Sequence, residues 1–182
     1  PMRRLLPYRL LAALLLGLST LVPAPLSALD ITRIRQSVVK IIVSIQREDY
    51  QQPWQRQGLS GGTGSGFFIG PRRILTNAHI VSDARFIEVQ RESDSRRYSA
   101  RVLFVGHDCD LALLEVDDPA FTESPPALLF GSQMPDLNDE VSAIGFPMGG
   151  DRLSITRGVV SRIDHNLYSH SGVDAHLVMQ VD

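Results

Sequence analysis

Residues 73–81 read Arg-Ile-Leu-Thr-Asn-Ala-His-Ile-Val, and His79 lies between two apolar pairs in this stretch. The first pair, Ile74 and Leu75, is typical of the end of a buried strand, and the small residues after it are typical of a turn. A side chain that follows such a turn is held by the fold and presented to solvent. Because histidine takes up and releases a proton near neutral pH, this placement suits a general base. A hydrogen-bonded core histidine is the alternative interpretation.

Short runs of apolar residues alternate with turns along most of the chain. The first run, residues 37–45, is rich in valine and isoleucine and predicts the first strand of a barrel. Further strands are expected at residues 67–69, 85–90, 98–105, 111–116, 140–144, 153–161 and 176–182. The only helical structure expected is a short turn at residues 31–36. Short strands separated by glycine and proline turns indicate an all-β barrel or sandwich.

Three segments between these runs are expected to be loops or connectors, and the first and the last of them to lie on the surface. Residues 46–59 predict a loop between two strands, and residues 116–127, which contain three prolines, are typical of a connector between two structural units. Residues 164–174 are polar and contain a glycine, so we expect an exposed and mobile loop there.

A glycine-rich run, Gly-Gly-Thr-Gly-Ser-Gly at residues 61–66, invites comparison with phosphate-binding loops. A P-loop needs a lysine after its last glycine, and a dinucleotide-binding loop must begin a helix. Residues 67–69, Phe-Phe-Ile, predict a strand instead. The glycines are therefore expected to let two backbones approach closely at a barrel corner, and no nucleotide cofactor is expected.

An acidic turn precedes the apolar strand at residues 111–116. Asp110 lies where this turn meets the strand, so its carboxylate can be shielded from water while it reaches a neighbouring loop and orients an imidazole. A turn cap is the alternative role, for which Asp108 is an equally good candidate. A metal site built on His79, His107 and Asp108 is a further alternative, but the histidines lack the close local spacing of zinc ligands.

The N-terminal residues have the three-part pattern of a secretory signal. Arginines precede an apolar block at residues 10–22, and Ala28 offers a small residue at a cleavage position. Residues 1–28 are therefore interpreted as a signal peptide, and the protein as exported to the periplasm or secreted. The apolar block is short for a membrane span, which needs about 20 residues, although an uncleaved signal would attach the protein to a membrane.

Composition and charge narrow the class of protein further. The chain has 182 residues, 43% of them hydrophobic, which suffices for one domain with a sizeable core or for two small barrels. A formal net charge of -2 provides no basic surface for nucleic acid, which is therefore not an expected partner. Cys109 is the single cysteine and forms no disulfide within the chain, so packing must hold the fold.

The surroundings of His79 and Asp110 closely resemble the HtrA (protease Do, or Deg) family of trypsin-like serine proteases. The resemblance rests on Thr-Asn-Ala-His-Ile-Val at residues 76–81 and on Asp-Leu-Ala-Leu-Leu at residues 110–114. It is supported by Gly-Thr-Gly-Ser-Gly-Phe at residues 62–67, Gly-Phe-Pro at residues 145–147 and Thr-Arg-Gly-Val-Val-Ser at residues 156–161. The match covers residues 37–182, and the joint spacing of the motifs is more specific than any one of them.

The resemblance implies a chymotrypsin-like fold, in which two antiparallel Greek-key β-barrels hold the active site between them. Residues 29–182 would form the trypsin-like protease domain. Within it, the first barrel is expected to be complete over about residues 37–117, a connector to follow over about 118–128, and the second barrel to be truncated over about 129–182.

The resemblance also implies a serine endopeptidase that acts on misfolded or damaged exported proteins, with His79 as general base and Asp110 as the residue that orients it. Neither Ser65, which precedes His79, nor Ser171 has the setting of a nucleophile, so the nucleophilic serine is expected after Asp182. The expected partners are unfolded polypeptides and, by analogy with the family, further copies in a homotrimer or larger oligomer. No metal or other cofactor is expected. A catalytically inactive relative that binds polypeptide as a chaperone or scaffold is the alternative.

Overall fold

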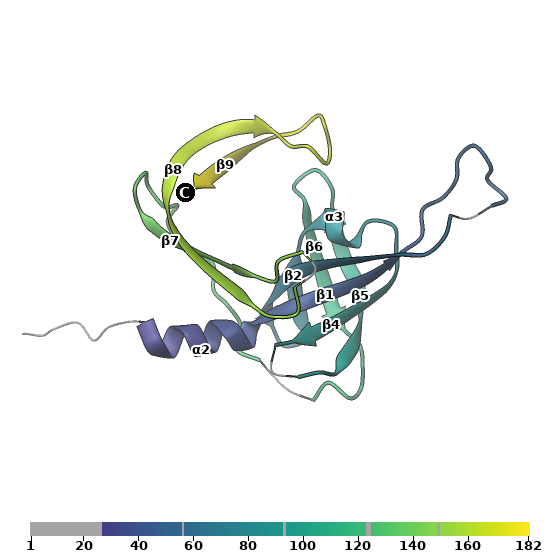
Figure 1. Ribbon diagram of the computed structural model, residues 1–182, viewed down its shortest axis with the longest axis horizontal. Coiled ribbons are helices and arrows are strands. Elements are labelled where there is room, and N and C mark those ends of the chain that lie inside the picture. The colour runs from purple at the N-terminus through teal and green to yellow at the C-terminus, as the bar shows by residue number, and fades with distance from the viewer. Residues whose placement is uncertain (1–26, 56, 93, 123–124, 149) are drawn as a thin grey trace, which may run out of the picture.

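The computed structural model describes residues 27–55, 57–92, 94–122, 125–148 and 150–182. Almost all of the predicted signal peptide therefore lies outside the described residues. Within the described part of the chain, no helix combines the length and the apolar character needed to cross a bilayer. The chain is built mainly from β-strands, which form a closed barrel and a separate three-stranded sheet (Figure 1).

Six antiparallel strands form the barrel in the order β1-β2-β3-β6-β5-β4, and β4 pairs with β1 to close it. Their bounds are β1 Val38–Ile45, β2 Ser60–Gly70, β3 Arg73–Thr76, β4 Ala84–Arg91, β5 Arg97–Gly106 and β6 Leu111–Val116. The strands expected from the sequence in this half of the chain are all present. Because the barrel is closed, each of its strands has a partner on both sides.

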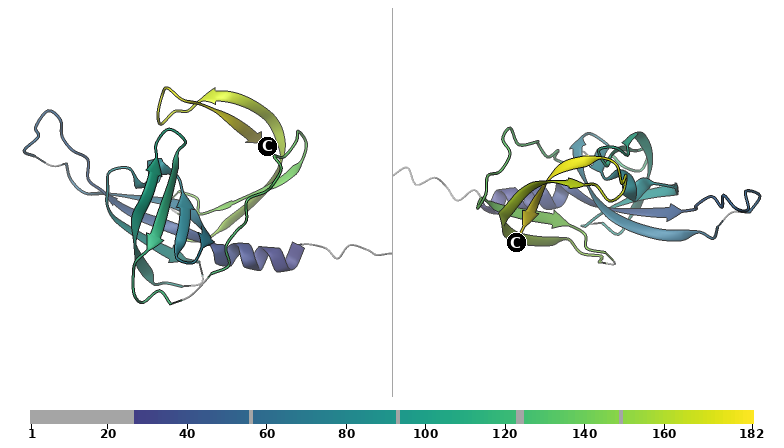
Figure 2. Two further views of the ribbon diagram at one scale, coloured as in Figure 1. Left: turned by 180° about the vertical axis from the view of Figure 1, so that it is seen from behind. Right: turned by 90° about the horizontal axis from the view of Figure 1, so that it is seen from above.

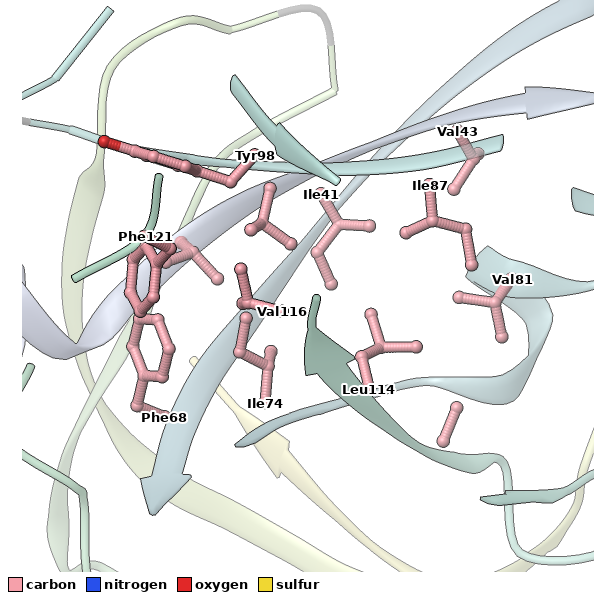
Figure 3. Packing of buried hydrophobic residues seen from close by; sticks show 13 residues of the cluster. Ile41, Val43, Phe68, Ile74, Val81, Ile87, Tyr98, Leu114, Val116 and Phe121 are labelled. Carbon is pink, nitrogen blue, oxygen red and sulfur yellow. The ribbon is translucent and has the colours of Figure 1, made fainter. Parts of the chain in front are cut away.

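The barrel interior is filled by alternate side chains of its strands (Figure 3). In β1 the residues Val39, Ile41 and Val43 point inward, as the two-residue period of a strand requires. The buried cluster comprises Val39, Ile41, Val43, Phe68, Ile74, Val81, Ile87, Val89, Tyr98, Ala112, Leu114, Val116 and Phe121.

The glycine-rich run forms part of β2 and faces this interior. A Cβ atom added to Gly66 would lie 2.8 Å from side-chain carbons of Ile41 and Ile74, and 3.0 Å from the carbonyl oxygen of Leu75. The sequence predicts glycines that permit close backbone approach. The structure shows that core side chains occupy most of the space instead.

The connector after β6 takes part in the core, a role that its sequence does not predict. The ring of Phe121 is 3% exposed, stacks on Phe68 with 5.8 Å between ring centroids, and meets Tyr98 edge-on at 5.1 Å. Arg72 holds this segment in place, since its guanidinium donates hydrogen bonds of 2.7–2.8 Å to the carbonyl oxygens of Val116, Asp118 and Phe121. Phe121 therefore packs at one end of the barrel interior.

Three antiparallel strands form the second sheet, in the order β7-β8-β9. They are β7 Glu140–Gly145, β8 Ser154–Leu167 and β9 Ala175–Val181. Among the described residues this sheet does not close, so β7 and β9 are its edges. Figures 1 and 2 show the curved sheet beside the barrel, with the helix α2, Ser27–Ser37, projecting from the start of β1 on the same side.

Two expectations about the extent of elements are wrong. The sequence predicts a loop over residues 164–174, but β8 continues through the first four of them, with Asp164 opposite Val178 and Leu167 opposite Ala175. Polar side chains are compatible with these positions because both faces of this part of the sheet meet solvent. The sequence also predicts only a short helical turn at residues 31–36, whereas α2 has 11 residues and includes the last two of the predicted signal peptide.

Candidate active site

A single helical turn after β3 presents His79. This turn, α3, spans Ala78–Val81, and its first and last residues are buried against the barrel. The side chain of His79 is 48% exposed. At the end of β3 the buried hydroxyl of Thr76 donates to the carbonyl oxygen of Ser65 at 2.8 Å, which fixes the point where α3 begins. The sequence predicts an irregular turn here, and the structure shows a short helix anchored by two apolar residues.

Asp110 occupies the turn before β6, and its side chain is 8% exposed. Its backbone has φ +52°, in the left-handed region that aspartate adopts more readily than most residues with a side chain. The backbone N–H of Ala78 donates to the Asp110 carbonyl oxygen at 3.1 Å. This bond ties the turn to α3, so the buried carboxylate faces the start of that helix.

Asp110 and His79 are joined by two contacts. His79 Nδ1 lies 2.8 Å from Asp110 Oδ2, and the backbone N–H of His79 donates to Oδ1 at 2.9 Å. The side-chain contact that we predict from the sequence is therefore present. A carboxylate can only accept a hydrogen bond, so Nδ1 carries the proton and Nε2 of the neutral ring is an acceptor.

Asn77 adds a third support that sequence reasoning missed. Its amide Nδ2 donates to Asp110 Oδ2 at 3.0 Å and to the Asp110 carbonyl oxygen at 3.2 Å. The sequence motif predicts only that Asn77 belongs to a turn of small residues. The sequence feature that could have predicted this contact is an amide side chain two residues before His79, which is able to reach a neighbouring turn.

Tyr168 was also missed. It begins the β8–β9 loop, residues 168–174, and its hydroxyl oxygen lies 3.3 Å from His79 Nδ1. The same hydroxyl interacts with the carboxylate of Asp110 and lowers the pKa of that group. No local sequence signal marks it, because 89 positions separate it from His79.

The charges of the site follow from these contacts. Burial raises the pKa of Asp110, but hydrogen bonds from Tyr168 and from the backbone and ring of His79 outweigh burial and leave it below its ordinary value. Burial, together with the hydrogen bond and the charge of Asp110, raises the pKa of Tyr168 to about 12. At neutral pH Asp110 is therefore a carboxylate and Tyr168 a neutral donor.

The other candidates from the acidic turn lie outside this network. Asp108 is exposed, and the carboxylate that meets the imidazole belongs to Asp110. His107 Nδ1 lies 3.2 Å from His170 Nε2 at the edge of the site. In the part of the chain that the structure describes, no group of three histidine, cysteine or acidic residues converges to hold a metal ion.

The two serines considered from the sequence have structural partners. Ser65 Oγ accepts a hydrogen bond from the Phe146 N–H at 2.7 Å and donates to the Phe146 carbonyl oxygen at 3.3 Å, which joins β2 to the end of β7. A Cβ added to Gly145 would lie 2.8 Å from Ser65 Oγ, so a side chain there would displace the Ser65 hydroxyl from these hydrogen bonds. Ser171 Oγ accepts from the backbone N–H of Asp174 at 3.1 Å.

A family model described as a trypsin-like peptidase domain matches residues 64–181, which include both His79 and Asp110. The chain is 42% identical over 156 residues to the putative protease Do-like 3, mitochondrial, of Arabidopsis thaliana, a match that covers 86% of this chain and 27% of the relative. The chain belongs to the HtrA (protease Do) family of trypsin-like serine proteases. This HtrA-family protein is also 43% identical over 146 residues to protease Do-like 2, chloroplastic, of the same plant, covering 80% of this chain and 24% of that one.

Solved structures agree with this assignment. The active form of the Rv3671c protease from M. tuberculosis superimposes with a TM-score of 0.61 at 26% identity, covering 83% of this chain and 59% of that one. The HtrA-type protease AlgW with a decapeptide shares the fold, with a TM-score of 0.62 at 20% identity and coverage of 83% and 50%. The HtrA-family chain spans about a quarter of the length of the two plant relatives.

Proposed function

We propose that this HtrA-family protein is a serine endopeptidase in which His79 is the general base and Asp110 orients it. The observation that carries the proposal is the double contact of one carboxylate with His79, through Oδ2 to the ring at 2.8 Å and through Oδ1 to the backbone N–H at 2.9 Å. This arrangement fixes both the tautomer and the direction of the imidazole. It leaves Nε2 free to accept a proton.

The reaction then proceeds as in other enzymes of this type. A serine hydroxyl transfers its proton to His79 Nε2 as its oxygen attacks the peptide carbonyl carbon, and the imidazolium returns the proton to the leaving amine. The negative charge of Asp110 stabilises the imidazolium during the transfer. We propose that the serine and the N–H donors of the oxyanion hole come from the segment that follows Asp182.

The substrates and location that we propose extend beyond the site itself. We propose that the enzyme cleaves unfolded or damaged polypeptides after export, and that it works as a trimer or larger homo-oligomer. Export is supported by the signal pattern at residues 1–28. The names of the two plant relatives place those proteins in mitochondria and chloroplasts. N-terminal sequencing of the secreted or periplasmic protein tests export, and a mature chain that begins at Leu29 is expected.

Casein cleavage by the full-length protein tests the catalytic assignment. His79→Ala should lower kcat by about 10⁶-fold because it removes the base. Asp110→Asn should lower kcat by about 10⁴-fold because it stabilises the wrong tautomer of the base. Asp108→Asn is the matched control, since it makes the same chemical change two residues away at an exposed position. It should stay within twofold of the parent protein.

Three outcomes would contradict the proposal. Equal activity of Asp110→Asn and Asp108→Asn would remove Asp110 from the mechanism, and an active His79→Ala would remove the base. If the parent protein binds unfolded casein without cleaving it and a fluorophosphonate probe labels no serine, the protein is the inactive polypeptide-binding relative. Labelling that is lost in His79→Ala supports the endopeptidase.

A further inference from the structure

Tyr168 places a hydroxyl from the loop of the second sheet next to His79 and Asp110, which both belong to turns of the barrel. Its backbone is held from both directions within the β8–β9 loop. The Tyr168 N–H donates to the carbonyl oxygen of Asp174 at 2.7 Å, and the Tyr168 carbonyl oxygen accepts from Gly172 N–H at 2.8 Å. The side chain therefore extends from a fixed base toward His79 and Asp110.

Ring contacts hold the Tyr168 side chain in this direction. Its ring meets His176 of β9 edge-on, with 5.4 Å between centroids, and lies 6.1 Å from the ring of His170. His170 in turn contacts His107, in the turn that carries Asp110, at 3.2 Å between ring nitrogens. The loop thus meets the Asp110 turn at two places, through the Tyr168 hydroxyl and through the histidine pair.

The direction of the Tyr168 hydrogen bond follows from the charges. Asp110 is a carboxylate at neutral pH and can only accept, and Tyr168 keeps its proton because its pKa is raised to about 12. The hydroxyl therefore donates to Asp110, and its oxygen lies beside His79 Nδ1 at 3.3 Å. Such a donor reinforces the arrangement in which Nδ1–H points at the carboxylate.

The Tyr168 contact also lies on the side of the imidazole that the reaction does not use. Tyr168 meets Nδ1, whereas the proton of the nucleophile is taken up at Nε2, on the opposite edge of the ring. The hydroxyl can therefore support the pair without occupying the place of the serine.

We infer that Tyr168 is a positioning residue of the catalytic centre, whose hydroxyl donates to Asp110 and thereby fixes the orientation of the His79–Asp110 pair. The inference rests on the proposed function of that pair. It assigns the second sheet a role in the general-base machinery, through one hydroxyl from the β8–β9 loop.

The test compares Tyr168→Phe with Tyr98→Phe in the full-length protein. Tyr98 is a matched control because its hydroxyl also donates to a carboxylate, Asp94 Oδ2 at 2.8 Å. Tyr98 and Asp94 form this hydrogen bond with each other and not with His79 or Asp110. Tyr168→Phe keeps the ring packed on His176 and removes only the hydroxyl. We expect kcat for casein to fall about tenfold with KM changed by less than twofold, since a hydrogen bond to a charged group contributes about this factor.

A second measurement does not depend on activity. Carbon-13 NMR of the Asp110 carboxyl group follows its titration directly, and loss of the Tyr168 donor should raise the pKa of Asp110 toward its ordinary value. Tyr98→Phe should leave both kcat and the Asp110 titration unchanged. Circular dichroism establishes that each variant is folded before either comparison is made.

The inference requires both changes. A lower kcat with an unchanged Asp110 titration, or a shifted titration with an unchanged kcat, would overturn it. If His79→Ala retains activity, the proposed function fails instead, and the Asp110 titration still shows whether the Tyr168 hydrogen bond exists.

Discussion

The barrel and the second sheet are built from similar apolar strands but bury them to very different extents. In β1 the side chains of Ile41 and Val43 are at most 2% exposed, whereas in β9 those of Leu177 and Met179 are 43–44% exposed. Closure gives every barrel strand two neighbours and one water-free face. In the three-stranded sheet β9 pairs, among the described residues, only with β8, and both of its faces meet solvent. An apolar strand therefore contributes stability only where another element covers it.

The same contrast applies to the candidate active site. His79 and Asp110 are both supplied by turns of the barrel, where buried neighbours hold the backbone. The sheet contributes Tyr168, from a loop attached to strands that are mostly exposed. The proposed general base and its partner thus belong to the well-packed region, and the hydroxyl proposed to support them comes from the less well-packed one. The following predictions test this division, from the largest expected effect to the smallest.

The largest effect should come from one leucine substitution made in both regions. Leu114 in β6 is fully buried, and Leu177 in β9 is 43% exposed. Leu114→Ala should lower the free energy of unfolding by about 3 kcal/mol through lost burial and a cavity, and Leu177→Ala by less than about 1 kcal/mol. Urea denaturation of the two variants measures both. Equal losses would mean that β9 is covered in solution, and the contrast between the regions would fail.

A smaller difference is expected between two arginines. Arg72 donates to three backbone carbonyl oxygens that join the connector to the barrel, whereas Arg162 bonds the exposed side chain of Gln180 across β8 and β9. Arg72→Met should lower the free energy of unfolding by about 2 kcal/mol, because it leaves those carbonyls without a charged donor. Arg162→Met should change it by less than about 0.5 kcal/mol. Thermal unfolding compares the pair, and a greater loss in Arg162→Met would contradict the division.

The smallest effect should appear in the pH dependence of stability. The pKa of Asp110 is lowered in the folded protein, so its carboxylate contributes stability that is complete above the unfolded pKa and is lost as pH falls through the folded pKa. In Asp110→Asn this contribution is absent. The difference in free energy of unfolding between parent and variant should therefore shrink as pH falls below about 4, which is the ordinary pKa of aspartate.

Asp182 provides the comparison from the sheet. Hydrogen bonds from Gln180 and Ser161 lower its pKa, but the residue is exposed and solvent weakens the interaction. Asp182→Asn should therefore follow the parent protein across the same pH range more closely than Asp110→Asn does. Urea titrations at several pH values provide the measurement. A larger pH dependence for Asp182 would show that the exposed end of β9 is buried in solution.

Local patterns were sufficient to predict most of the strands and the central contact of the site. The run rich in valine and isoleucine at residues 37–45 predicts β1, and the resemblance around His79 and Asp110 predicts which carboxylate meets the imidazole. Both signals are local, because a strand has a fixed period of two and each motif is a short continuous run. In the structure the 2.8 Å contact joins the imidazole to Asp110 and not to Asp108.

The sequence by itself thus determined the strand pattern and the two residues that form the proposed catalytic pair. Only the tertiary structure decided that Phe121 of the connector packs in the barrel core, that β8 continues to Leu167, and that Tyr168 reaches Asp110. Each of these depends on a partner distant in sequence, such as the 44 positions between Arg72 and Val116 or the 89 between Tyr168 and His79. A local pattern specifies which side of an element is apolar or polar. How much free energy is gained by burying that side, or by pairing its hydrogen-bonding groups, depends on which other element of the fold packs against it.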